Sequence, residues 1–149
     1  MKKYELTEET FTVFGKTLYR IRAVRDFGSV KTGEFGGYIE KEENLSHFGD
    51  AWVYGNAKVS GNAWVYGNAK VFNTRHFFVQ GPIGSRDGYV TFYRTKDDTV
   101  EVRCGCFSGS LQEFVNQVEE THGGSRYEKE YKLAAELAKV CIRLEGESR

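Results

Sequence analysis

The stretch GPIGSRDGY, residues 81–89, has the residue types that best suit the binding of an anion. Its glycines, among them Gly84, free the backbone to turn, and successive amide N–H groups in such a loop can form a nest for a negative charge. Ser85 adds a hydroxyl group and Arg86 adds a planar fork of N–H donors. The stretch is neither a Walker loop nor a dinucleotide-binding loop, because it lacks the Gly-Lys-Ser/Thr motif and no helix is expected directly after it. An ordinary glycine-rich connection is the alternative interpretation.

Two strands expected over residues 88–95 and 99–107 place aromatic and basic side chains beside this loop. If the apolar side chains of these strands face the helices, then Tyr89, Tyr93 and Arg103 face away from them. Tyrosine rings stack on nucleobases and arginine binds phosphate, so this face suits a nucleotide. The same residue types are also enriched at protein interfaces, which leaves a docked protein as the second hypothesis. The residues expected to bind a ligand are Gly84, Ser85, Arg86, Tyr89, Tyr93, Arg94, Arg103 and, at the rim, His76.

Catalytic and metal-binding groups are not indicated by the residue spacing. His47 is isolated, whereas a general base needs a placed partner, and no acid, base and nucleophile occur at a usable spacing. Cys104, Cys106 and His122 lack the paired spacings that zinc sites show, so two small core cysteines are the favoured interpretation. The sequence therefore predicts a protein that is not an enzyme and has no catalytic residues, no cofactor and no metal.

A six-residue repeat, Gly-Asn-Ala-x-Val-x, precedes these strands at residues 49–54, 55–60, 61–66 and 67–72, with Asp50 in place of the first asparagine. The alanine and valine of each unit are two residues apart and point to one side of an extended strand. Gly-Asn pairs mark regular corners between the strands. Together with less regular units back to residue 37, the repeat predicts about two coils of a left-handed-type β-solenoid over residues 37–72.

The remaining segments complete a predicted α+β fold. Residues 1–36 are expected to form a β-hairpin cap, and residues 73–149 a small antiparallel sheet followed by two helices. Capping boxes at Ser110 with Glu113, and at Ser125 with Glu128, are expected to start the helices. The second helix is apolar over much of its surface, which indicates burial against the sheet or a partner chain. Its additional apolar residues are Leu133, Leu137, Val140 and Leu144.

Charge and composition narrow the function classes. Lysine plus arginine equals aspartate plus glutamate, at 21 each, which disfavours binding of duplex DNA. The polar N-terminal stretch and the absence of a long apolar run predict no secretion signal and no membrane contact. Three cysteines are an odd number that fits reduced thiols in a cytoplasm. Two coils would leave open β edges, so a homo-oligomer, a dimer or trimer, is expected.

The stretches LYRIRAVRDFG (18–28) and VKTGEFGGYIEKEENLSHFGDAWVYGNAKV (30–59) resemble a family of short hexapeptide-repeat β-solenoid proteins abundant on bacteriophage and prophage genomes. Residues 81–97 and 105–123 look like the C-terminal domain that often follows in that family. The resemblance implies a cytoplasmic phage protein in a bacterial host, and it implies no catalytic residues. Because small proteins of such origin often disarm host defences, it implies an oligomer that sequesters a small anionic or nucleotide-like ligand. The alternative is a scaffold that inhibits or docks a host or phage protein.

Overall fold

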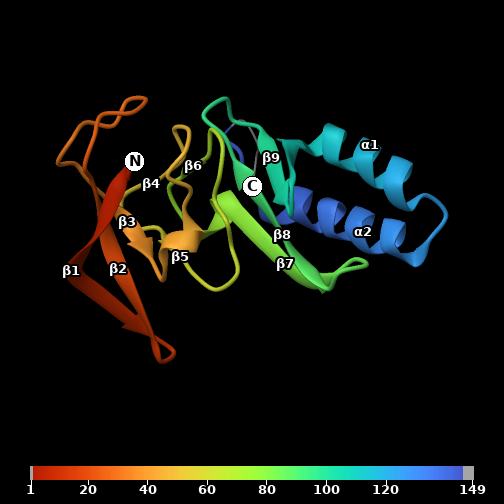
Figure 1. Cartoon of the computed structure of the whole chain (residues 1–149), viewed down its shortest axis with the longest axis horizontal. Helices are drawn as coiled ribbons and strands as arrows, with labels where there is room; N and C mark the ends of the chain where they lie inside the picture. Colours follow the sequence, from red (N-terminus) through yellow and green to blue (C-terminus); the bar gives the residue numbers. More distant parts are fainter. Residues whose placement is uncertain (1, 146–149) are drawn as a thin grey trace.

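The computed structural model describes residues 2–145 and shows an α+β protein, which confirms the predicted class (Figure 1). The chain begins with a hairpin of β1 (Tyr4–Val13) and β2 (Lys16–Ala23), and β3 (Phe35–Ile39) pairs antiparallel with β2. β5 (Lys58–Val59) then pairs with β3 in parallel, so the first sheet is mixed and has the order β1-β2-β3-β5. Figure 1 shows this sheet at one end of the molecule and the two helices at the other.

The repeat forms very short strands around a buried row of small apolar side chains. β4 (Trp52–Val53) pairs in parallel with β6 (Lys70–Val71) in a separate sheet of two strands. The glycine that opens each unit has a positive φ, between 57° and 69°, as a corner of this kind requires. Every alanine and valine of the repeat is buried, as the two-residue spacing predicted: Ala51, Val53, Ala57, Val59, Ala63, Val65, Ala69 and Val71.

The predicted β-solenoid over residues 37–72 is not what the sheets show, and their layout does not fit the hexapeptide-repeat family. The first sheet is mixed, because β3 pairs antiparallel with β2 and parallel with β5, and β4 and β6 form a separate sheet of two strands. The glycine corners limit β4, β5 and β6 to two residues each, and Leu45 and Val65 make only an isolated parallel bridge. A strand of two residues makes few backbone hydrogen bonds of its own. Its pairing therefore depends on the segments that pack beside it, and the first sheet is mixed.

The second sheet is antiparallel, as predicted, with the order β10-β9-β8-β7. One face packs on the helices α1 (Leu111–His122) and α2 (Arg126–Cys141) through Val90, Phe92 and Val102, which confirms the predicted orientation of these strands. Among residues 2–145, neither helix has the length and apolar character that crossing a bilayer requires. The four strands are β7 (Phe77–Ile83), β8 (Gly88–Arg94), β9 (Val100–Cys104) and β10 (Phe107–Ser110).

The two helix starts differ from each other. The capping box of Ser110 and Glu113 is present, with both reciprocal hydrogen bonds. The predicted box at Ser125 is wrong, because the Ser125 hydroxyl donates to the carbonyl of His122 and Glu128 accepts instead from the amide of Gly124. A short glycine-containing turn between the helices provides these nearer partners.

Helix α2 buries only one face against the sheet, through Ala134, Ala135 and Ala138. Leu133, Leu137 and Val140 are not buried against this sheet, since they are 70%, 46% and 68% exposed, whereas Leu144, beyond the end of the helix, is partly buried there. Cover by a partner chain stays a prediction.

Two hydrophobic clusters hold the chain together. The first joins β1–β3 with the repeat and includes Tyr93 of β8, and the second lies between the second sheet and the helices. The repeat therefore packs on the face of β8 and β9 that is turned away from the helices. The predicted division into residues 1–36, 37–72 and 73–149 stays a prediction.

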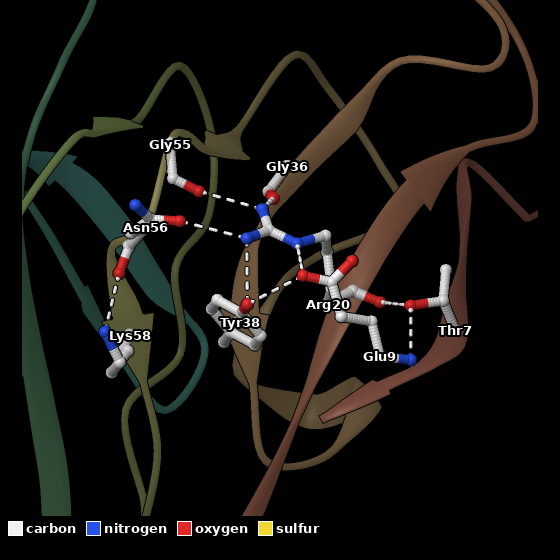
Figure 2. Close-up of polar contacts among 8 residues, drawn as sticks. All are labelled: Thr7, Glu9, Arg20, Gly36, Tyr38, Gly55, Asn56 and Lys58. Atoms are coloured by element: carbon white, nitrogen blue, oxygen red, sulfur yellow. Dashed lines mark hydrogen bonds and ion pairs between the residues drawn. The ribbon is translucent and has the colours of Figure 1, made fainter. Parts of the chain in front are cut away.

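Arg20 of β2 is the centre of a polar network that ties β1, β2 and β3 to the corner at residues 55–58 (Figure 2). Its Nη1 donates to the carbonyl oxygens of Gly36 (2.6 Å) and Gly55 (3.1 Å). Its Nη2 donates to the Tyr38 hydroxyl (2.8 Å) and to Asn56 Oδ1 (2.9 Å), and its Nε to Glu9 Oε2 (2.8 Å). With its donors engaged and its side chain 15% exposed, Arg20 has a structural role.

Substituting Arg20→Leu is expected to lower the free energy of unfolding by about 2–3 kcal/mol, because partly buried acceptors lose a charged donor. The matched control is Arg22→Leu on the same strand, whose ion pair with Glu5 is exposed. That change is expected to cost less than about 1 kcal/mol. Urea unfolding followed by circular dichroism measures both, and equal losses would contradict the role of the network.

Candidate binding cleft

The glycine-rich loop at residues 81–89, which was predicted to bind an anion, already donates a hydrogen bond to a carboxylate of the protein itself. Gly84 has a φ of 80°, and its amide N–H donates to Oε1 of Glu130 on α2 at 2.7 Å. Ser85 and Arg86 are exposed at the end of the β7–β8 hairpin, and Tyr89 is 41% exposed nearby. One amide of the loop therefore has an internal carboxylate as its acceptor, and binding of an external anion by the loop stays a prediction.

Three other predicted ligand residues are buried and have internal partners or neighbours. Tyr93 is completely buried in the first hydrophobic cluster. Arg94 donates to Asp98 and Glu145 at 3.0 Å each and to the carbonyl of Lys70 at 3.3 Å. His76 Nδ1 accepts the amide N–H of Phe72 (2.9 Å), and burial together with the charge of Arg94 lowers the pKa of His76.

Arg103, the last of the predicted set, lies with its guanidinium carbon 4.2 Å from the Trp64 ring centre and 4.4 Å from that of Tyr66. The structure thus separates the set into Gly84, Ser85, Arg86 and Tyr89 at the hairpin, and the others beneath the repeat. The predicted tyrosine and arginine face exists, but residues 64–72 cover much of it. Of the two cysteines predicted for the core, Cys104 packs with the second cluster and Cys106 is exposed.

A cleft of about 530 Å³ is lined by residues 41–43, 45–48 and 61–64. None of the predicted ligand residues lines it. Phe48 is 75% exposed, and its amide N–H donates to the Ser46 hydroxyl at 3.0 Å. Trp64 is 38% exposed. The cleft therefore presents two aromatic side chains from different segments to the solvent.

Asn44, which is fully buried, joins the two walls of the cleft. Its Oδ1 accepts the amide N–H groups of Glu40 (3.1 Å) and Lys41 (3.0 Å). Its Nδ2 donates to the carbonyl oxygens of Gly61 (3.1 Å) and Ala63 (2.9 Å). One amide side chain thus fixes the backbone of both walls, and the cleft is formed before any ligand arrives.

Trp64 is fixed in place without being buried. The guanidinium of Arg103 lies against its ring, and Tyr66 meets it edge to face at 5.9 Å between ring centres. The amide N–H of Trp64 donates to the Thr91 hydroxyl of β8 at 2.9 Å. Arg103 therefore positions the tryptophan from the side of the second sheet.

The polar rim of the cleft carries both charges, and Lys2 pairs with Glu42 of the rim at 3.7 Å. His47 Nδ1 accepts the amide N–H of Lys3 (3.0 Å), so the proton on Nε2 donates to Glu42 Oε1 (2.8 Å). This hydrogen bond lowers the pKa of Glu42. Glu43 and Lys41 complete the rim. Because both nitrogens of His47 are engaged, its role here is structural.

The arrangement suits the stacking of a flat apolar group rather than acid–base chemistry. Within residues 2–145, no three His, Cys, Asp or Glu side chains are grouped as a metal site would require. Sequence reasoning missed the cleft, although two signals were present. Residues 41 and 47 break the apolar row of the repeat, and tryptophan occupies an outward position at residue 64.

The sequence matches no protein-family model and no curated protein, so the resemblance to the phage hexapeptide-repeat family is not supported, in agreement with the arrangement of the sheets.

Proposed function

We propose that this protein is a non-enzymatic binding protein that takes an uncharged planar ring into the cleft, stacked on Trp64. The observation that carries this proposal is that Trp64 is both exposed and fixed, by Arg103 and by Thr91. An exposed tryptophan without a ligand gains little from such bracing. A ring that stacks on Trp64 binds more tightly if the tryptophan is already fixed, because the side chain then loses no conformational entropy on binding.

The size and lining of the cleft support a small ring-bearing ligand. Ligand pockets range from about 300 to 1,000 Å³ and are mainly apolar with a few polar groups. The cleft, at about 530 Å³, combines Leu45, Phe48 and Ala63 with Ser46 and the rim charges. Stacking of a base on an aromatic side chain contributes about 1–3 kcal/mol.

The rim argues for a ligand without negative charge. Glu42 and Glu43 are balanced by Lys41 and by Lys2, which pairs with Glu42 at 3.7 Å, and His47 is engaged with Glu42, so the rim has no positive excess for an anion. A phosphate group would meet two carboxylates here, whereas an uncharged ring would meet only the apolar walls. The sequence predicted a nucleotide-like ligand. We therefore propose that the cleft binds the uncharged ring of such a ligand and not its phosphate.

Calorimetric titration with adenosine and with N-acetyltyrosinamide tests the proposal with two kinds of uncharged ring. At least one is expected to bind saturably, and AMP is expected to bind more weakly than adenosine because of its phosphate. Trp64→Leu is expected to weaken binding about tenfold or more, as the loss of a stacked ring implies.

The matched control is Tyr89→Leu, which removes another half-exposed aromatic ring far along the chain from the cleft. It is expected to leave the affinity unchanged. No saturable heat with either compound at millimolar concentration, or equal losses in the two variants, would refute the proposal.

A further inference from the structure

We infer that a second, smaller cavity binds a phosphate-sized oxyanion between two lysines that lie far apart in the sequence. The cavity has a volume of about 240 Å³ and lies away from the aromatic cleft. Its polar and charged lining comprises Ser29, Asp50, Tyr54, Asn68, Lys70 and Lys96.

The backbone brings these lysines together. The parallel pairing of β4 with β6 places Lys70 beside Trp52, and the ammonium of Lys70 lies 5.9 Å from the Tyr54 ring centre. The turn between β8 and β9 reaches back to the repeat, where the amide N–H of Lys96 donates to the carbonyl of Asn68 at 2.9 Å. A turn at residues 27–30, with Gly28 packed against Asp50, forms another part of the lining.

The lining of this cavity contains two lysines and one carboxylate, that of Asp50. Within residues 2–145, neither Lys70 nor Lys96 makes an ion pair. Asp50 acts electrostatically on the buried Lys3, whose ammonium donates to the carbonyl of Ala51 at 2.6 Å. The two ammonium groups and the one carboxylate of the lining leave an excess of one positive charge, which a small oxyanion would offset.

The neutral polar groups suit an oxyanion as well. The Tyr54 hydroxyl, which has Ser29 as a hydrogen-bond partner, and the amide of Asn68 line the same cavity and can each donate a hydrogen bond to an oxyanion. The size admits a free phosphate ion and excludes most of a nucleotide. This site is independent of the proposed ring-binding cleft. The sequence predicted an anion site in the loop at residues 81–89, whereas the site inferred here lies in a different part of the chain.

Titration with sodium phosphate at constant ionic strength, followed by calorimetry, tests the inference. Wild-type protein is expected to bind inorganic phosphate saturably, and Lys70→Gln and Lys96→Gln are each expected to weaken binding about tenfold. Ribose 5-phosphate is expected to bind more weakly than phosphate, because its sugar does not fit. Stronger binding of the sugar phosphate would overturn the proposed free-ion site.

Lys58→Gln is the matched control, since Lys58 occupies the same place in the repeat twelve residues earlier and lies over the rings of Phe11 and Tyr38 instead. It removes one positive charge from the same kind of strand outside the cavity. Its phosphate affinity is expected to equal that of the wild type. An equal loss in Lys58→Gln, or no phosphate binding by the wild type, would overturn the inference.

Discussion

Gly36→Ala is expected to lower the free energy of unfolding by about 3 kcal/mol or more, because it overpacks the first hydrophobic cluster. An added Cβ would lie 2.6 Å from the carbonyl oxygen of Val53, 2.7 Å from Cγ1 of Ile21 and 2.8 Å from Cζ2 of Trp52. Real Cβ atoms do not come within 3.0 Å of such neighbours, so the surroundings would have to move.

These neighbours have little freedom to move. Val53 is paired with Val71 across β4 and β6, and its carbonyl belongs to that backbone. Trp52 is held edge to face by Tyr4 and by Phe27, and Ile21 is fully buried. The clash therefore spreads into β4 instead of being relieved by one flexible side chain.

Gly88→Ala is the control for this experiment. Gly88 begins β8, has no heavy atom within 4 Å of an added Cβ, and does not have a positive φ. Its replacement is expected to change stability by less than about 0.5 kcal/mol. Urea unfolding followed by circular dichroism measures both proteins, and equal midpoints would show that β3 and β4 are not packed as closely as described.

The side-chain periodicity of the repeat was predictable, but the pairing of its strands was not. The two-residue spacing of Ala51 and Val53, repeated three times, is enough to place them on a buried side. Nothing in that spacing distinguishes β4 from β5, yet β4 pairs with β6 and β5 pairs with β3. The two sheets also differ in that β3 pairs antiparallel with β2 of the long β1–β2 hairpin, which is a tertiary effect.

The orientation of the second sheet was also predictable, but not what covers its free face. Alternation correctly separated Val90 and Phe92 from Tyr93 and Arg103. An arginine and a tyrosine look the same in sequence whether they face a ligand or the protein's own repeat. Contact of Arg103 with Trp64 required the packing of segments nearly forty residues apart, which no local pattern encodes.

Asn44→Leu is the second substitution with a large expected effect, because it acts on both stability and the proposed ring binding. Leucine has a similar volume but cannot replace the four hydrogen bonds that Asn44 makes with the backbone at residues 40, 41, 61 and 63. Since each buried polar group left without a partner costs about 1–3 kcal/mol, a loss of about 3 kcal/mol or more is expected.

The control is Asn68→Leu, at the asparagine of the last repeat unit, whose side chain is exposed. It is expected to change stability by less than about 0.5 kcal/mol. Thermal unfolding monitored by circular dichroism compares the two variants. A loss for Asn68→Leu as large as that for Asn44→Leu would contradict the role of this clamp, the four hydrogen bonds by which Asn44 joins the two walls of the cleft.

Binding of adenosine or N-acetyltyrosinamide, measured at a temperature where Asn44→Leu is still folded, separates the two effects. Because the clamp fixes the wall that carries Trp64 to the wall that carries Phe48, its loss is expected to weaken ring binding even in the folded protein. Unchanged affinity in the folded variant would mean that Trp64 is positioned by Arg103 and Thr91 alone. The walls would then act as separate surfaces, and the size of the cleft would have no influence on which ring it binds.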